Sequence, residues 1–411
     1  MASDAPTSTD ADAGPSAAVQ WGIDYVGGTA AEATGDPIRI GYASDGNLFP
    51  DSVVFADATA DYINKYLGGI DGRPVEIVHC NMSVPEDGAT CATQFANDDS
   101  IVLAMVGQAL SGNADFYATI NGKKPVYTGS PSGIDDFVST VSVSYFTGAL
   151  GASFGIAQFV LDDLKPKTVA FVITDDAAGR GGFSLIQPIM SRDGATVNPV
   201  FVQPTATAPE IESAMQAVQV DTADVIVIGM FEQGCIASYD ALKNLGIDPT
   251  KTSVVAVAPC HGAAMQAHMS EVGEPGILPN GWYFTGQGYN IFTGNAESGT
   301  DTVIDILDKA GKSEALYSVG SEEMISGLVT VVKHLNSLDG DFSIDKVTSA
   351  IRDFTGPVMS AAGPMKCGGA ATFPGICGMQ TSVERYIDGG WEATRSSDNS
   401  VDFASLMGFS V

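Results

Sequence analysis

The sequence predicts an α/β protein with two doubly wound α/β lobes joined by three hinge crossings. Apolar strands alternate with amphipathic helices from about residue 38, and the alternation begins a second time near residue 168. The 411 residues are too many for one ordinary core. A hydrophobic content of 45% with 47 glycines is typical of a folded α/β protein rather than a disordered chain.

The first 35 residues are expected to form a flexible N-terminal linker, because they are mostly Ala, Asp, Ser, Thr, Gly and Pro. Residues 19–26 are an exception and are expected to pack on the body, since Trp21, Ile23 and Tyr25 gain from burial. No charged-then-apolar signal segment opens the chain, and no apolar run approaches the roughly 20 residues of a membrane helix. The linker has the composition of a segment that follows a cleaved secretion signal.

The first βα series supplies most of lobe 1. The run 101–107 is almost continuously apolar, as in a parallel strand buried on both faces. Helix 52–67 shows an apolar stripe and stops at the glycines that follow it. The series is predicted to contain strands 38–43, 74–80, 101–107 and 124–128, and helices 52–67, 85–97 and 112–120.

The second series supplies lobe 2, after a crossing strand at 141–146. Its predicted strands are 168–174, 196–202, 224–229 and 253–258, and its predicted helices are 148–164, 182–192, 209–220, 232–245 and 262–272. Later helices near 297–310, 320–338 and 343–352 return to lobe 1. Lobe 1 is therefore expected to comprise 36–143 and 285–356, and lobe 2 to comprise 144–284 and 357–411, with crossings near 143–147, 281–287 and 354–359.

The six cysteines fall into three short-range couples. Six cysteines allow 15 pairings, but the strand–helix plan favours the couples Cys80 with Cys91, Cys235 with Cys260, and Cys367 with Cys377. An even count in a chain with a secreted composition indicates an oxidising compartment. Six separate buried thiols in a cytosolic protein are the alternative.

The charge balance excludes several classes of function. Nineteen Lys and Arg stand against 49 Asp and Glu, for a formal net charge of −30. Such a surface repels phosphate backbones and anionic lipid, so neither nucleic acid nor a membrane surface is expected as a partner.

The sequence carries no recognisable catalytic or metal-binding pattern. The chain has no phosphate-binding Walker loop, no paired-histidine zinc helix and no nucleophile elbow. Its four histidines are scattered, and the carboxylate pairs Asp135–Asp136 and Asp175–Asp176 are expected in solvated loops. We therefore expect that the protein is not an enzyme and that it has no cofactor and no metal site.

Two exit loops carry the most informative polar residues. Gln108 and Ser111 follow strand 101–107, and Ser130 and Ser132 follow strand 124–128. Because the carboxyl ends of neighbouring parallel strands meet at one sheet edge, the two loops are expected side by side. Ser111 is predicted to cap the following helix and to leave free N–H groups, which favour a carboxylate or another acceptor. The alternative is that these serines are only cap and turn residues.

Several segments resemble the branched-chain amino acid (leucine/isoleucine/valine) binding family of type I periplasmic binding proteins, which serve ABC importers. The matching segments are 38–43, 62–77, 106–112, 125–130 and 169–175. The most specific is 64–74, where an asparagine precedes Gly-Gly-Ile-Asp-Gly-Arg-Pro by four residues. The resemblance covers nearly the whole folded chain from Ile38 onward.

By this resemblance, a solute sits in a cleft between lobes that close by hinge bending. The family's serine falls on Ser111, and its backbone-and-hydroxyl pair falls on Ser130 and Ser132, which would hold a ligand carboxylate. The loop after the first strand would bring Asn47 and Phe49 to the mouth of the cleft.

In lobe 2, the family's aromatic position falls on Phe231 and its tyrosine position on Ala178. The acidic residue that holds a ligand ammonium group would lie in 259–262, where no carboxylate stands; Glu232 and Asp45 are substitutes. Arg180 and His261 favour an anionic solute, aromatic or dicarboxylic, if both face the cleft. The alternatives are core positions for both phenylalanines, a surface pair of Arg180 with Asp175 or Asp176, and a turn role for His261.

The resemblance implies an extracytoplasmic solute-binding protein of an ABC importer, monomeric, with a membrane permease as its partner. It would be periplasmic or a cell-surface lipoprotein. The alternative is a ligand-sensing module of a signalling system, which uses the same fold. A sensor usually carries a membrane or signalling segment, and we find none in this chain, so transport is favoured.

Overall fold

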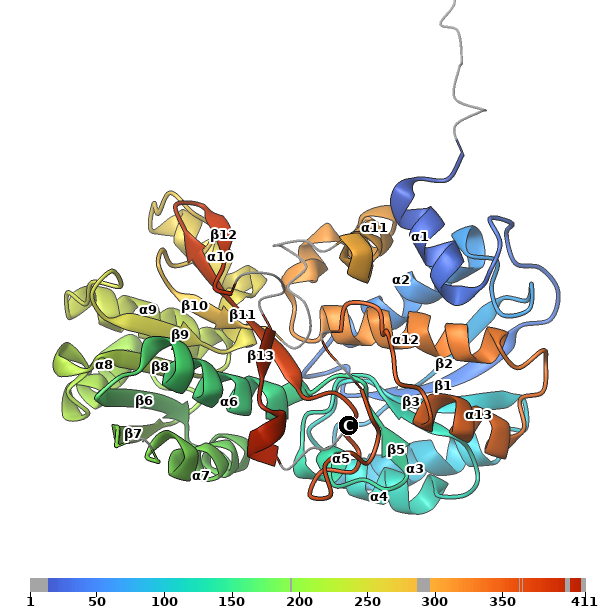
Figure 1. Ribbon diagram of the computed structural model, residues 1–411, viewed down its shortest axis with the longest axis horizontal. Coiled ribbons are helices and arrows are strands. Elements are labelled where there is room, and N and C mark those ends of the chain that lie inside the picture. The colour runs from blue at the N-terminus through green and yellow to red at the C-terminus, as the bar shows by residue number, and fades with distance from the viewer. Residues whose placement is uncertain are drawn as a thin grey trace, which may run out of the picture.

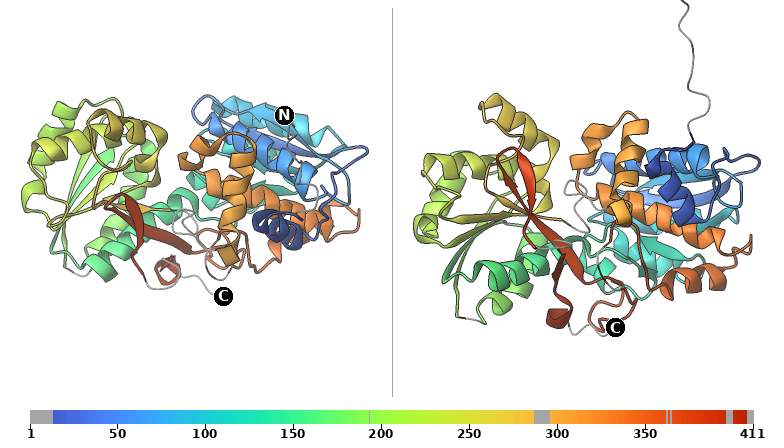
Figure 2. Two further views of the ribbon diagram at one scale, coloured as in Figure 1. Left: turned by 90° about the horizontal axis from the view of Figure 1, so that it is seen from above. Right: turned by 45° about the horizontal axis from the view of Figure 1, so that its top comes forward.

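The computed structural model describes residues 14–192, 194–286, 296–361, 363, 365–395 and 400–407. It contains two β-sheets, each covered by helices on both faces (Figure 1). The two lobes lie side by side and are joined by crossing segments, as the view from above also shows (Figure 2). Below, the first lobe is the five-stranded sheet with its helices, and the second lobe is the eight-stranded sheet with its helices.

The first lobe is a parallel sheet with strand order β2-β1-β3-β4-β5. Along β3, Leu103 and Met105 pack into one core cluster, and Ala104 and Val106 pack into another on the opposite face. The apolar run is therefore buried on both sides, as predicted. The strands are β1 (Ile38–Ser44), β2 (Val75–Asn81), β3 (Ile101–Val106), β4 (Val126–Thr128) and β5 (Ser142–Val143).

The helices of this lobe come from two stretches of the chain. They are α2 (Asp51–Tyr66), α3 (Pro85–Ala96), α4 (Asn113–Ile120) and α5 (Ile134–Phe137), and then α11 (Thr300–Lys309), the 3₁₀ helix η5 (Ser313–Tyr317), α12 (Ser321–Asn336) and α13 (Ile344–Arg352). Helix α12 is buried along most of its length and packs on α2. Its first residues lie at the carboxyl ends of the strands, and its last residue, Asn336, bonds to Asp71 ahead of β2.

The second lobe follows the path β12-β11-β10-β9-β8-β6-β7, with β13 paired to β11. Its parallel strands are β6 (Thr168–Thr174), β7 (Thr196–Val202), β8 (Val225–Gly229), β9 (Ser253–Ala256) and β10 (Tyr283–Thr285). Antiparallel strands β11 (Gln380–Ile387), β12 (Gly390–Ala393) and β13 (Ser400–Asp402) complete it. Its main helices are α6 (Gly148–Phe159), α7 (Ala177–Met190), α8 (Ala208–Ala217), α9 (Glu232–Asn244) and α10 (Ala263–Glu271).

The last three strands were not predicted as strands. Thr381, Ser382 and Glu384 are fully buried in β11, so the strand lacks the alternation of apolar and polar residues that marks a half-buried strand. Polar residues of this kind predict a solvent-exposed segment. It is the pairing of β11 with β10 that makes the segment part of the sheet.

The N-terminal prediction needs correction. Residues 17–26, assigned above to a flexible linker, form helix α1 (Ala17–Val26), capped by the side chain of Ser16. Val19, Ile23 and Val26 are buried against the first lobe, at a spacing that places them on one helical face. The expectation that residues 19–26 pack on the body is confirmed. Residues 1–13 lie outside the described residues.

Two helix predictions also differ in detail. Helix α7 begins at Ala177 rather than 182, because the Asp176 side chain accepts a hydrogen bond from the Gly179 N–H at 2.7 Å and caps the earlier start. The predicted helix 148–164 is α6 followed by a π-helical turn, Val160–Leu164. The predicted strand 141–146 is reduced to the two residues of β5.

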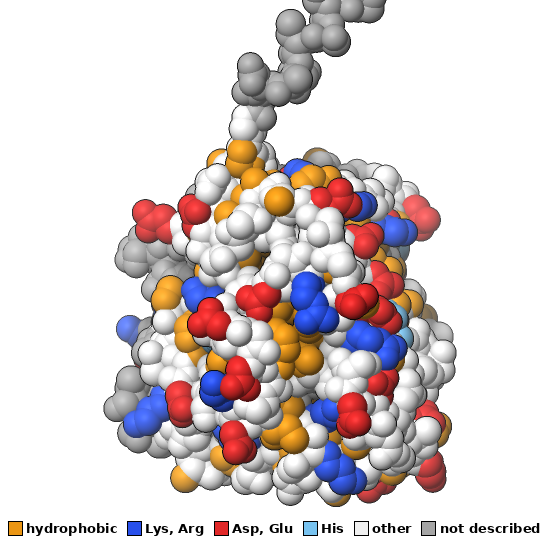
Figure 3. All heavy atoms as spheres, turned by 90° about the vertical axis from the view of Figure 1, so that its right-hand side faces the viewer, with side chains coloured by type: hydrophobic (Ala, Val, Ile, Leu, Met, Phe, Trp, Pro, Cys, Tyr) orange, Lys and Arg blue, Asp and Glu red, His pale blue; other side chains and the backbone are white. Residues whose placement is uncertain are grey.

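All three cysteine couples are disulfides: Cys80–Cys91, Cys235–Cys260 and Cys367–Cys377. Within the described ranges, no helix is long and apolar enough to cross a membrane. The outer face of the first lobe carries Asp and Glu interspersed with Lys and Arg, so no large patch of one sign forms there (Figure 3).

Candidate functional site

Loops from three strands of the first lobe meet at the carboxyl edge of its sheet. The Asp45 N–H after β1 donates to the Gln108 carbonyl after β3 at 2.9 Å. A Cβ placed on Gly320, which caps α12, would lie 3.2 Å from Ser130 Oγ and 3.3 Å from Gln108 Nε2. Gln108, Ser130 and the start of α12 therefore converge at one point.

Ser111 lies on the same edge but does not cap α4. The N-cap is Gly112, with a φ of 82°, where the chain approaches Gly88 of α3 so closely that a Cβ on Gly88 would meet the Gly112 carbonyl. Only glycine suits this positive φ and close approach without strain. The predicted capping role of Ser111 is wrong, and its side chain is partly buried.

The loop after β4 is held by one buried carboxylate, Asp136. Its Oδ2 accepts the N–H groups of Ser132 at 2.8 Å and Gly133 at 3.1 Å. Its Oδ1 accepts Asn113 Nδ2 at 2.8 Å and the Tyr117 hydroxyl at 2.6 Å. Asp136 was expected in a solvated loop; it is 2% exposed, so that expectation is wrong.

The environment of Asp136 acts in two directions on its ionisation. Burial raises the pKa of this carboxyl, and the hydrogen bonds from Tyr117, Ser132, Gly133 and Asn113 oppose the rise because they stabilise the charged form. Asp135, the neighbouring acid in the sequence, is exposed as expected.

A second buried acid, Glu323 of α12, lies near the same loop. Its Oε1 accepts the Gly148 N–H at 3.3 Å, and the Ser130 hydroxyl lies within hydrogen-bonding reach of the carboxyl group. Burial raises the pKa of Glu323 to about 8, against the effect of these two hydrogen bonds. The same burial, together with the charges of Glu323 and Glu384, raises the pKa of Glu322.

The local sequence does not mark these glutamates as site residues. Glu322 and Glu323 occupy the first turn of α12, where acidic residues are ordinary because of the helix dipole. The available signal was the run 324–332, which contains no charged residue and thus indicates a helix that is buried along that length.

The loop after β1 is tied to the loop after β2. Asp45 Oδ1 accepts the N–H groups of Asn47 and Leu48 at 3.1 Å and the Ser83 hydroxyl at 2.9 Å. Asn47 is exposed and donates to Ser83 Oγ at 2.9 Å, while Phe49 is partly buried. Asp45 is thus engaged in local structure rather than presented as a substitute for the missing ammonium ligand.

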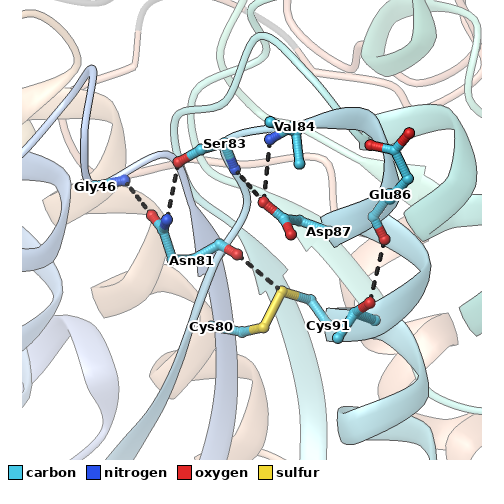
Figure 4. Close-up of a disulfide and its surroundings, with 9 residues drawn as sticks. Gly46, Cys80, Asn81, Ser83, Val84, Glu86, Asp87 and Cys91 are labelled. Carbon is cyan, nitrogen blue, oxygen red and sulfur yellow. Dashed lines mark hydrogen bonds between the residues drawn. A yellow bond between two sulfur atoms is a disulfide. The ribbon is translucent and has the colours of Figure 1, made fainter.

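Asn81 and the first disulfide reinforce this corner (Figure 4). The Gly46 N–H donates to Asn81 Oδ1 at 2.9 Å, and Asn81 Nδ2 donates to Ser83 Oγ at 2.8 Å. The disulfide Cys80–Cys91 joins the end of β2 to α3 beneath them. The loop that carries Asn47 and Phe49 is therefore held in place by these hydrogen bonds and by the nearby disulfide.

In the second lobe, Phe231 follows β8 and is 39% exposed at the N-cap of α9. Glu232, beside it, accepts the Ala264 N–H of α10 at 2.7 Å and so is also engaged. Ala178 lies in α7, and its side chain is outside the described part of the chain.

Arg180 is committed to its own lobe. Its Nε donates to Asp175 Oδ1 at 2.5 Å, and its guanidinium lies 4.4 Å from the centroid of the Phe201 ring. The surface pair that was weighed as an alternative for Arg180 is therefore present.

His261 ends the 3₁₀ helix η3 (Ala258–His261) after β9. Its ring packs edge-on against Phe284 and Trp391, with centroids 6.1 and 6.2 Å away. Burial lowers the pKa of His261 to about 4, although a hydrogen bond to the backbone of Tyr317 opposes the shift. The imidazole is thus neutral near neutral pH, and it touches η5 of the first lobe.

The predicted site residues fall on two sheet edges. Gln108 and Ser130 come together, and Ser111, Ser132, Asn47 and Phe49 occupy loops of the same edge. The second-lobe candidates follow strands β6, β8 and β9.

Other features of the described chain do not compete with this site. The described residues contain no group of His, Cys, Asp or Glu suited to a metal ion. A surface pocket on α12 and α13 is lined by Lys333, His334, Lys346 and Phe354, at the opposite end of α12 from Glu323.

The sequence of the chain matches one protein family. A family model described as periplasmic binding protein matches residues 37–374. A search of curated proteins finds no match.

Three solved structures are similar. An ABC transporter solute-binding protein from R. palustris, in complex with 4-hydroxybenzoate, is 14% identical over 89% of this chain and 97% of its own, with a TM-score of 0.68. An ABC transporter substrate-binding protein from Desulfitobacterium hafniense, in complex with Leu, is 16% identical over 87% and 99%, with a TM-score of 0.65. A fatty acid ABC transporter substrate-binding protein from Thermomonospora curvata is 14% identical over 92% and 95%, with a TM-score of 0.69. At these identities the structural likeness concerns the fold.

Proposed function

Because the chain belongs to the periplasmic binding protein family, we propose that it captures a small solute outside the cytoplasm and delivers it to the permease of an ABC importer. Family membership places the chain among solute-binding proteins rather than enzymes. The observation that carries the proposal is the family match over residues 37–374, on a fold whose two sheets each end in candidate loops. Relatives of the same fold are described with 4-hydroxybenzoate and with Leu, which are both small solutes.

The solute would lie between the lobes, taken as 36–143 with 285–356 and 144–284 with 357–411. Ligands of open α/β sheets bind at the carboxyl ends of strands, and both sets of candidate residues lie there. The first lobe would contribute Asn47, Phe49, Gln108, Ser111, Ser130 and Ser132, and the second Ala178, Arg180, Phe231 and His261. Rotation about the three crossings would close the cleft on the solute.

The exposed ring of Phe231 supports a role in the second lobe. An aromatic side chain that is 39% exposed at a helix start gains little from its own core, and it would gain from contact with a solute on closure. Three disulfides support a location outside the reducing cytoplasm, either periplasmic or as a cell-surface lipoprotein. In that location the chain would act as a monomer that docks on its permease.

A thermal-shift screen tests this function directly. A ligand that binds only the folded state raises the melting temperature, so at least one small solute in a broad metabolite panel should raise it in a concentration-dependent way. Phe231→Ala should reduce that rise while leaving the melting temperature of the solute-free protein almost unchanged. Ile344→Ala, which alters an equally exposed apolar residue on α13, is the matched control. If no solute shifts the wild type, or if both variants behave alike, the proposed site is wrong.

A further inference from the structure

We propose that the loop after β4 does not hold a solute carboxylate, because two carboxyl groups of the chain itself already take its donors, and that the solute instead presents hydrogen-bond donors. This inference rests on the proposed function and narrows the class of solute. It also reverses the role that the family resemblance implied for Ser130 and Ser132.

The donors of this loop can be followed one by one. The Gly129 N–H donates to the Val106 carbonyl at 2.8 Å. The Ser132 and Gly133 N–H groups donate to Asp136, and the Ser132 hydroxyl donates to the Ser130 carbonyl at 3.0 Å. The Ser130 hydroxyl lies within reach of the Glu323 carboxyl and lowers its pKa. Pro131 has no N–H, so the backbone N–H of Ser130 is the donor left uncommitted within the described residues.

Asp136 occupies the place that a bound carboxylate would need. Each of its oxygens accepts two donors, one pair from backbone N–H groups of the loop and the other from the side chains of α4. A carboxylate that accepts several hydrogen bonds in a buried site is held strongly, since each bond to a charged group exceeds an ordinary one in strength. A solute carboxylate would have to displace Asp136 and would leave that buried charge without its donors.

The surrounding charges act in the same direction. Glu322, Glu323 and Glu384 lie near one another at the start of α12, and burial raises the pKa of Glu323 to about 8, so its carboxyl is largely neutral near neutral pH. The two candidate cations of the second lobe offer a solute carboxylate little attraction, because Arg180 is paired with Asp175 and His261 is neutral near neutral pH. A solute carboxylate therefore lacks a charge partner at this edge, whereas a solute with hydroxyl, amide or amine donors can bond to the carbonyl and carboxyl oxygens there.

A solute that presents donors would distinguish this protein from the two relatives described with 4-hydroxybenzoate and Leu, because both of those solutes carry a carboxylate. Identities of 14% and 16% leave room for such a change within one fold. Gln108 remains suited to either kind of solute, because its side-chain amide both donates and accepts.

Amide NMR signals of Ser132 and Gly133 in the isotope-labelled protein test the inference without knowledge of the solute. Acetate and benzoate are the probes. In the wild type we expect no saturable shift of these two signals. In Asp136→Ala the freed N–H groups should bind the probes, with an affinity at least about tenfold above that of the wild type. Asp135→Asn, which changes the exposed neighbour, should behave as the wild type.

Every outcome of the NMR experiment either supports or overturns the proposal. A saturable shift at Ser132 or Gly133 in the wild type overturns the proposal. The absence of any shift in a folded Asp136→Ala protein also overturns it, because the freed N–H donors should then bind the anion. If Asp136→Ala does not fold, Asp136→Asn, which keeps an acceptor but removes the charge, should show at least part of the gain, and no gain there also counts against the proposal.

A matched solute panel separates this inference from the proposed function. 4-Hydroxybenzamide should raise the melting temperature more than 4-hydroxybenzoate, and leucinamide more than 4-methylpentanoate. A larger rise with either acid overturns the inference and leaves solute binding intact. If no solute of any charge class raises the melting temperature, solute binding itself is contradicted. The NMR experiment still shows whether the N–H groups of the loop are available to a carboxylate.

Discussion

The Tyr117 hydroxyl donates a 2.6 Å hydrogen bond to Asp136 Oδ1, so that helix α4 and the loop after β4 share one buried carboxylate. Tyr117 also lies 2.8 Å from Thr128 Oγ1, at the last residue of β4. Burial and the adjacent charge of Asp136 raise the pKa of the tyrosine. The phenol thus remains a donor across the accessible pH range, and the loop that carries Ser130 and Ser132 takes its shape from this contact.

Tyr117→Phe should therefore destabilise the protein. It removes one hydrogen bond to a buried charge and leaves the ring in place, so the free energy of unfolding should fall by about 1.5–3 kcal/mol. Chemical denaturation measures the change. Tyr66→Phe, which removes a hydroxyl from a less buried ring on α2, is the control and should cost far less. An equal loss in both variants would mean that the Asp136 contact contributes nothing special.

Glu323 should make stability depend on pH with a definite sign. Burial raises its pKa to about 8, above its ordinary value of 4.5, so the folded state binds this proton more tightly than the unfolded state. Its contribution to stability is fully present below the unfolded pKa and is lost as pH rises through the folded value. Glu323→Gln, which stays neutral, should therefore gain stability relative to the wild type as pH rises from about 5 to about 9.

Denaturation midpoints across this pH range provide the measurement. Glu314→Gln, at an exposed position in η5, is the control and should follow the wild-type curve. Glu322 and Asp136 also have raised pKa values, so the Glu323 variant should flatten the profile only in part. Parallel curves for the wild type and Glu323→Gln would show that Glu323 is not buried as described.

Helix α1 should behave as part of the first lobe. Ile23 is 9% exposed in the core cluster of that lobe, so Ile23→Ala should lower the free energy of unfolding by about 2–4 kcal/mol. Gln20→Ala, on the exposed side of the same helix, should change it by less than about 0.5 kcal/mol. A flexible linker would show no difference between the two variants, and urea denaturation distinguishes the cases.

The disulfide between Cys235 and Cys260 should contribute measurably to stability. It closes a loop with a sequence separation of 25 residues between α9 and the end of η3. Loss of the link in Cys235→Ala/Cys260→Ala should lower the free energy of unfolding by about 3 kcal/mol on the chain-entropy model. Mass spectrometry without reductant should find no free thiol in the wild type; any alkylated cysteine would contradict the pairing.

The sequence by itself determined the alternation of strands and helices, the three disulfide couples, and the loops that follow β3 and β4. These features depend on local periodicity and on rules for neighbouring parallel strands, which the residues of each segment carry. It did not determine β11, because a strand that buries Thr381, Ser382 and Glu384 has no apolar alternation. It also missed the α1 helix within a segment of linker composition.

Only the tertiary structure decided the ionic character of the site. Asp136 becomes a buried acceptor because α4 supplies Asn113 and Tyr117 to it, and Glu323 meets Ser130 because α12 returns to the same sheet edge from much later in the chain. The burial of a carboxyl group, and hence its charge and its partners, is a property of what the rest of the chain packs around it. For that reason identical residue types at Asp135 and Asp136 have opposite surroundings, one in solvent and one at the centre of the loop.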